Sequence, residues 1–102
     1  MMDVLVTLIG KGKSFVDENG NEKFEVVETE IFGDIGNIGQ REFAAASQMG
    51  LKPEFMIEIW SFEYNGEDKL KLGDKLYSIY RTYQKGDRLE LYLTQRSGIN
   101  ET

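Results

Sequence analysis

The feature that most constrains the fold of this chain is a series of tight-turn signals that separate short, strand-like runs. Turn residues occur at Asp17–Asn21, Asn65-Gly66, Gly73-Asp74 and Lys85–Asp87. Asn and Gly tolerate the positive φ that a tight hairpin requires, so each group is expected to reverse the chain. Turn signals at this spacing predict a small antiparallel β-barrel or sandwich of about six strands.

The runs between the turns alternate between apolar and polar residues, as half-buried strands do. In the last run Leu89, Leu91 and Leu93 share one face, which is predicted to lie in the core. Trp60 is expected at the core or its edge. The clearest predicted strands are Val4–Ile9, Phe24–Ile35, Phe55–Phe62, Leu76–Tyr83 and Leu89–Thr94.

The second-last run carries a face rich in tyrosine and arginine. Strict alternation would place Tyr77, Ile79, Arg81 and Tyr83 together on a partly exposed face. Tyrosine and arginine are enriched at protein interfaces, so Tyr77, Arg81 and Tyr83 are candidates for an interface. The same residues could instead stack the bases of a single strand.

One short helix is predicted at about residues 40–49. Gly39 is placed as its N-cap, and Glu42 could reach back as half of a capping box. Gly50 is placed as the left-handed residue that follows a helix, and Pro53 blocks continuation. Gly33, Gly36 and Gly39 recur at every third position, which does not match a dinucleotide-binding motif and indicates a bulge or bend.

Composition narrows the function classes. The chain has 102 residues, so we expect a single domain at 1–96 with a flexible tail at 97–102. It contains no histidine and no cysteine, which rules out the usual triads and His or Cys metal sites. We therefore expect no enzyme activity, no catalytic residue, no cofactor and no metal. No apolar run of membrane-spanning length occurs, so no membrane association is expected.

The charge of the chain argues against nucleic-acid binding. Eighteen acidic residues face twelve basic ones, for a net charge of −6. A duplex-binding domain usually carries a clustered basic face, because phosphate neutralisation supplies most of its affinity. The lysines here are interleaved with acids, except for the pair Lys11 and Lys13.

The order of motifs resembles that of the small head-closure, or head-tail joining, proteins of tailed bacteriophages. The motifs are Arg-Glu-Phe at 41–43, a small-residue helix, Gly-Leu-Lys-Pro-Glu at 50–54, Tyr-Ser-Ile-Tyr-Arg-Thr-Tyr at 77–83 and Leu-Glu-Leu-Tyr-Leu at 89–93. The turn at 17–21 occupies the place of the family's D-x-x-G-N turn. Gly39 stands where the family often has Ser or Thr, and residues 33–37 are richer in glycine.

The resemblance implies a non-catalytic structural protein of the phage or prophage virion, made in the cytoplasm of the bacterial host. Such proteins add as a ring of dodecameric type beneath the portal and adaptor after DNA packaging. The ring retains the packaged DNA with only passive contact, and it docks the tail proteins. Two alternatives stay open: a tail-completion or adaptor protein of the same neck region, or a small-barrel binding module for a peptide or single-stranded nucleic acid.

The resemblance also implies a β-barrel with an inserted loop and helix, here residues 33–53. This insertion is a candidate for channel or subunit contacts, and an equally open interpretation is that its helix only caps the barrel. The candidate contact residues are Gly33, Gly36, Gly39, Arg41, Glu42, Phe43, Ala46, Gly50 and Lys52.

Overall fold

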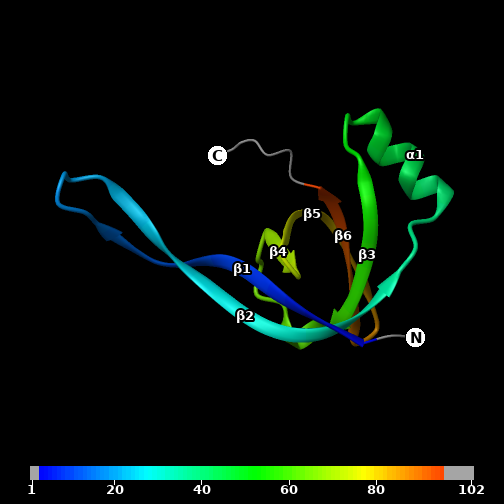
Figure 1. Ribbon diagram of the computed structural model, residues 1–102, viewed down its shortest axis with the longest axis horizontal. Helices are drawn as coiled ribbons and strands as arrows, with labels where there is room; N and C mark the ends of the chain where they lie inside the picture. Colours follow the sequence, from blue (N-terminus) through cyan, green and yellow to red (C-terminus); the bar gives the residue numbers. More distant parts are fainter. Residues whose placement is uncertain (1–2, 96–102) are drawn as a thin grey trace.

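The computed structural model describes residues 3–95, in which six antiparallel strands close into a barrel. Around the barrel the strands follow the order β1, β2, β3, β6, β5, β4 (Figure 1). The mainly β fold with one short helix is as the sequence predicts. The elements are β1 (Asp3–Val16), β2 (Glu22–Gly36), α1 (Gln40–Gln48), β3 (Pro53–Trp60), the 3-10 turn η1 (Ser61–Glu63), β4 (Lys69–Leu72), β5 (Lys75–Lys85) and β6 (Arg88–Gln95).

The interior of the barrel is filled by aliphatic side chains at alternating positions of the strands. The predicted core face of β6 is confirmed, because Leu91 and Leu93 are fully buried and Leu89 is nearly so. Burying one such side chain contributes about 1.5–3 kcal/mol, so this cluster is the main source of stability. The cluster comprises Val6, Leu8, Ile31, Ile57, Ile59, Leu70, Tyr77, Leu89, Leu91 and Leu93.

The ribbon formed by β1 and β2 is much longer than the barrel is tall. β1 continues to Val16 instead of ending near Ile9, and its partner β2 begins at Glu22. The connecting turn is fixed by Asp17, whose Oδ1 accepts hydrogen bonds from the backbone N–H groups of Asn19 and Asn21, both at 2.9 Å. Residues 10–27, here called the arm, project away from the barrel (Figure 1).

The ends of α1 follow the predicted pattern only in part. Gly39 is the N-cap, and Gly50 has the left-handed φ of 82°. The N–H groups of Gly50 and Leu51 bond to the carbonyls of Ser47 and Ala46, both at 3.0 Å, which forms a Schellman motif. The prediction of a capping box is wrong, because no side chain caps the start of the helix and Glu42 bonds to Arg81 of β5 instead.

The insertion between β2 and β3 is narrower than residues 33–53. Gly33 and Gly36 belong to β2, and Pro53 is the first residue of β3. A Cβ on Gly33 would lie 2.5 Å from Cγ2 of Ile57, and one on Gly36 would lie 2.9 Å from Cε of Met56. These two glycines therefore allow β2 to approach β3 closely. They form part of the barrel wall and not a pliable loop.

The outer face of β5 differs from the predicted one because the alternation breaks. A register shift between Ile79 and Arg81 pairs Ile79 with Leu93 of the core and Arg81 with outward-facing Tyr92. Tyr77 is consequently buried, with its ring edge-on to Phe55 at 5.0 Å, so its assignment to the interface face was wrong. Arg81 and Tyr83 remain exposed on the outside.

Trp60 also differs from expectation. Its side chain is 42% exposed, so it lies on the outer surface and not in the core. The predicted tail at 97–102 lies outside the described residues. Over residues 3–95 no helix combines the length and the apolar composition needed to cross a bilayer.

We predict that Gly33→Ala lowers the free energy of unfolding by about 1–3 kcal/mol, because the new methyl group overlaps Ile57 in a packed wall. Gly39→Ala is the control: its Cβ meets nothing within 4 Å, and its φ of −70° suits alanine. Urea denaturation should show a loss below about 1 kcal/mol for this control. Equal losses for the two variants would contradict the close-approach role of Gly33.

Candidate interaction surfaces

The helix is fastened to the outside of the barrel by one carboxylate. Oε1 of Glu42 accepts a hydrogen bond from Nη2 of Arg81 at 2.6 Å, and its Oε2 accepts one from the hydroxyl of Tyr80 at 2.9 Å. The guanidinium of Arg81 lies 4.4 Å from the ring centroid of Tyr92, whose hydroxyl donates to Glu90 at 2.7 Å. These five residues, here called the clamp, join α1 to β5 and β6.

The contacts of the clamp shift the pKa values of Glu42, Arg81 and Tyr92. Burial raises the pKa of Glu42, but the hydrogen bonds from Arg81 and Tyr80 and the charge of Arg81 lower it by more. The hydrogen bond to Glu42 raises the pKa of Arg81. Burial and the hydrogen bond to Glu90 raise the pKa of Tyr92 to about 12. The charged pair of Glu42 and Arg81, which lies between the uncharged side chains of Tyr80 and Tyr92, therefore holds the helix.

The other candidate residues of the insertion do not converge on one site. Ala46 is buried within its own molecule, so it is not available for close approach by another backbone. Phe43 is half exposed and Arg41 is exposed without an ion pair in the described chain. The carbonyl of Lys52 accepts a hydrogen bond from Oγ1 of Thr94 at 2.8 Å. Only Glu42 and Arg81, predicted in separate groups, are brought together.

The arm carries a set of apolar side chains that are 44–69% exposed. Lys11 lies over the ring of Phe24, with Nζ 5.2 Å from its centroid. The sequence pattern predicted an end of the first strand near Ile9, so this surface was not predicted. A strand that pairs with residues 24–35 across a tight turn must be equally long, and that requirement could have revealed it. The exposed apolar residues are Phe15, Val16, Phe24, Val26 and Val27.

A row of four carboxylates crosses the outer wall of the barrel. Asp3 pairs with Asp34, Asp34 with Glu58, and Glu58 with Glu90 on the neighbouring strands β1, β2, β3 and β6. Like charges directly opposite each other destabilise a sheet. Nothing in the sequence announces this row, because its members come from four separate strands.

Two cations offset part of this repulsion. Nη2 of Arg88 lies 3.3 Å from Oδ2 of Asp34 and donates to the carbonyl of Glu58 at 3.2 Å. Nζ of Lys85 lies 3.5 Å from Oε2 of Glu90. Asp3 has no cation at this range in residues 3–95, and its hydrogen bond with Asp34 and the charge of Asp34 raise its pKa. The row therefore holds more acidic than basic side chains.

Trp60 and Phe62 form an aromatic pair beside this row. Their ring centroids are 6.4 Å apart with an interplanar angle of 25°, and Phe62 is 80% exposed. The guanidinium of Arg88 lies 4.4 Å from the Trp60 ring centroid. The surface combines aromatic rings with carboxylates, a chemistry that suits a protein partner better than a phosphate backbone.

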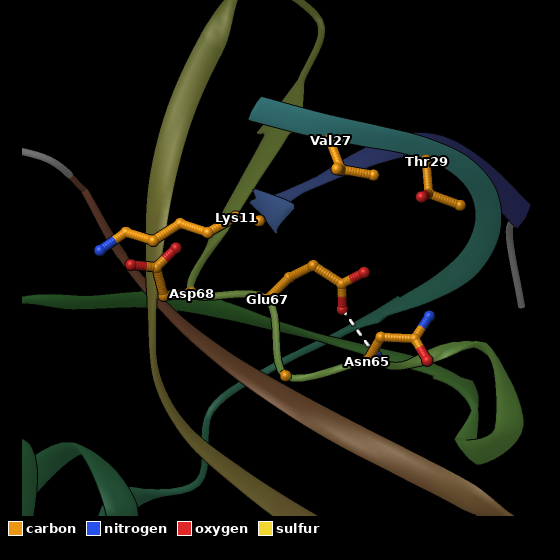
Figure 2. A pocket seen from close by; sticks show the side chains of 8 residues that line it. Lys11, Val27, Thr29, Asn65, Glu67 and Asp68 are labelled. Atoms are coloured by element: carbon orange, nitrogen blue, oxygen red, sulfur yellow. Dashed lines mark hydrogen bonds between the residues drawn. The ribbon is translucent and has the colours of Figure 1, made fainter. Parts of the chain in front are cut away.

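A pocket of about 320 Å³ lies where the arm leaves the barrel. Figure 2 shows the carboxylate of Glu67 directed toward Asn65, below the strand that carries Val27 and Thr29. Glu67 is buried, and its Oε1 accepts a hydrogen bond from the N–H of Asn65 at 2.8 Å. A Cβ on Gly10 would lie 2.9 Å from Cγ of Glu67. Glu67 and Gly10 thus bring the loop before β4 into close contact with the root of the arm.

Acidic side chains do not gather into a metal site in the described part of the chain, where no group of three lies close enough to hold an ion. Comparison with known proteins adds no relative: no protein-family model, curated protein or solved structure matches this chain.

We predict that Glu42→Gln loosens α1 and lowers the free energy of unfolding by about 1 kcal/mol, since Arg81 is partly exposed to solvent. The folded-state pKa of Glu42 lies below the ordinary 4.5. The stabilisation of the fold by ionised Glu42 is therefore fully present above pH 4.5 and is lost as the pH falls through that lower pKa.

Urea denaturation between pH 3 and pH 7 measures this difference. The two chains should converge at the acidic end, and amide exchange in α1 should be faster in Glu42→Gln. Glu54→Gln, an exposed change on β3, is the matched control and should leave both readouts unchanged. A constant difference at every pH would contradict the role of the Glu42 charge.

Proposed function

We propose that this protein is a structural subunit of the head–tail connector of a tailed bacteriophage, acting in head closure as a member of a ring. The observation that carries the proposal is the arm, a long projection whose five large apolar side chains stay largely exposed in the described chain. Projections of this kind are stabilised when a neighbouring subunit covers them. The motif order described above supplies the phage context.

The clamped helix fits the same proposal. α1 lies on the outside of the barrel, and its exposed residues include Phe43 and Met49, which are 52% and 68% exposed. Glu42 holds it there by charge and not by extensive apolar burial, since Ala46 is its buried residue. An element attached in this way can be presented to the portal or adaptor above or to a tail protein below.

The choice of head closure within the neck rests on the motif order. The geometry does not separate it from a tail-completion or adaptor subunit, which would use the same features. A free single-strand-binding module is disfavoured because the aromatic pair Trp60 and Phe62 stands beside the acidic row and not beside lysines. Phosphates would be repelled there.

We predict that the isolated protein is a monomer or a weak oligomer at micromolar concentration and that it forms a ring only on a preassembled connector. Its net charge of −6 makes like copies repel unless a template offsets the cost. Sedimentation of the free protein, and of the protein mixed with DNA-filled tailless heads of its phage, tests this. A stable closed ring of free protein at moderate salt, or no binding to the heads, would contradict it.

We also predict no measurable binding to duplex DNA at physiological salt, because a connector subunit must release DNA during ejection. Base stacking of about 1–3 kcal/mol per aromatic would not hold a strand without phosphate contacts. Arg81→Ala should lower stability by freeing α1, without any effect on DNA. Micromolar duplex binding with steep salt dependence, abolished by Arg81→Ala, would favour a nucleic-acid-binding module.

A further inference from the structure

Besides the edge of β1 in the arm, two strand edges of this molecule lack a partner strand within residues 3–95. In β5, residues 75–78 pair with β4, but residues 80–85 pair only with β6 and leave their other edge open. In β2, residues 22–33 pair only with β1. Residues 81–85 and 22–28 are also exposed along their whole length. Open strand edges are templates for pairing with another chain.

The two edges carry opposite charge. The open part of β5, residues 80–85, has Arg81 and Lys85 and no acidic residue. Within the arm, β2 has Glu22, Lys23 and Glu25, and two further glutamates follow directly at positions 28 and 30. Opposite charges on facing strands stabilise pairing, so these two edges are complementary.

The other edge of the arm is unsuited to β5. From Gly10 to Val16, β1 carries Lys11 and Lys13 and no acid, so it would repel the basic strand. Its register also shifts between Lys11 and Ser14, and such a bulge disrupts a ladder of backbone hydrogen bonds. Charge and regularity therefore both select the β2 edge.

The lengths of the two edges agree. At about 3.3 Å per residue, the open part of β5 and the part of β2 within the arm each span roughly 20 Å. The arm points away from its own barrel (Figure 1), and β5 forms no pair with it in this molecule. The complementary edge must therefore belong to a different molecule.

We propose that the β2 edge of one copy's arm adds to the open β5 edge of a second copy and extends its sheet. The contact joins two different surfaces, so it repeats head to tail and generates a ring if the rotation closes. This inference rests on the proposed ring, for which it names the partner and the surfaces. The apolar residues of the arm would then be covered by the neighbouring barrel.

The contact should be weak in the free protein, with a dissociation constant on the order of 1 mM. Amide resonances followed by NMR from about 0.05 to about 1 mM should shift mainly in residues 80–85 and 22–30. The double variant Glu25→Lys/Glu28→Lys reverses the charge of the β2 edge and should remove this dependence on concentration. Glu54→Lys/Asp74→Lys makes the same change in net charge on exposed residues elsewhere and should retain it.

Three results would overturn the pairing: no concentration-dependent shift in residues 80–85, equal shifts in both double variants, or shifts that follow the β1 edge at residues 10–16. Binding to DNA-filled tailless heads is measured for the same variants. If the heads still bind the protein while residues 80–85 never respond to a second copy, the connector role stands and the edge pairing is wrong. If the heads do not bind the protein and residues 80–85 do not respond to a second copy, both proposals are wrong.

Discussion

The close approach of β2 to β3 at Gly33 is the constraint on which the rest of the structure depends. The two strands share only a short ladder, from Asp34 to Gly36 on β2 and from Met56 to Glu58 on β3. A side chain at Gly33 would occupy the space of Ile57. Because β2 meets β3 only at this end, its remaining length pairs with β1 alone, and the part before residue 28 leaves the barrel with β1 as the arm.

The closure of the barrel by the contact of β2 with β3 separates an inner surface from an outer one. The inner residues form one apolar core that needs no partner, whereas the outer residues gather into the clamp, the acidic row and the two open edges. The clamp satisfies its own polar groups, but the other outer features and the arm carry costs that the described chain offsets only in part: apolar area in water, facing carboxylates and unpaired backbone. Neighbouring subunits offset such costs, and this is the physical basis of the connector proposal.

Much of the fold could be predicted from local chemistry in the sequence. Turn residues and alternation predicted the β class, the leucine face of β6 and the glycine that ends α1. Prediction failed where a tertiary contact overrode the local pattern. The register shift after Ile79 turned Tyr77 inward, and Glu42 bonded to β5 instead of its own helix start. The length of the arm could have been inferred from strand pairing, but the acidic row and the open edges depend on topology alone.

The central claim is that this barrel acts as a ring subunit whose arms reach neighbouring copies. Cryo-electron microscopy of the phage neck at a resolution that separates strands tests it most directly. The account predicts a ring of these barrels between portal and tail, with each arm lying along β5 of the adjacent subunit. Barrels that stand apart with their arms in solvent, or a neck that contains none of them, would contradict it.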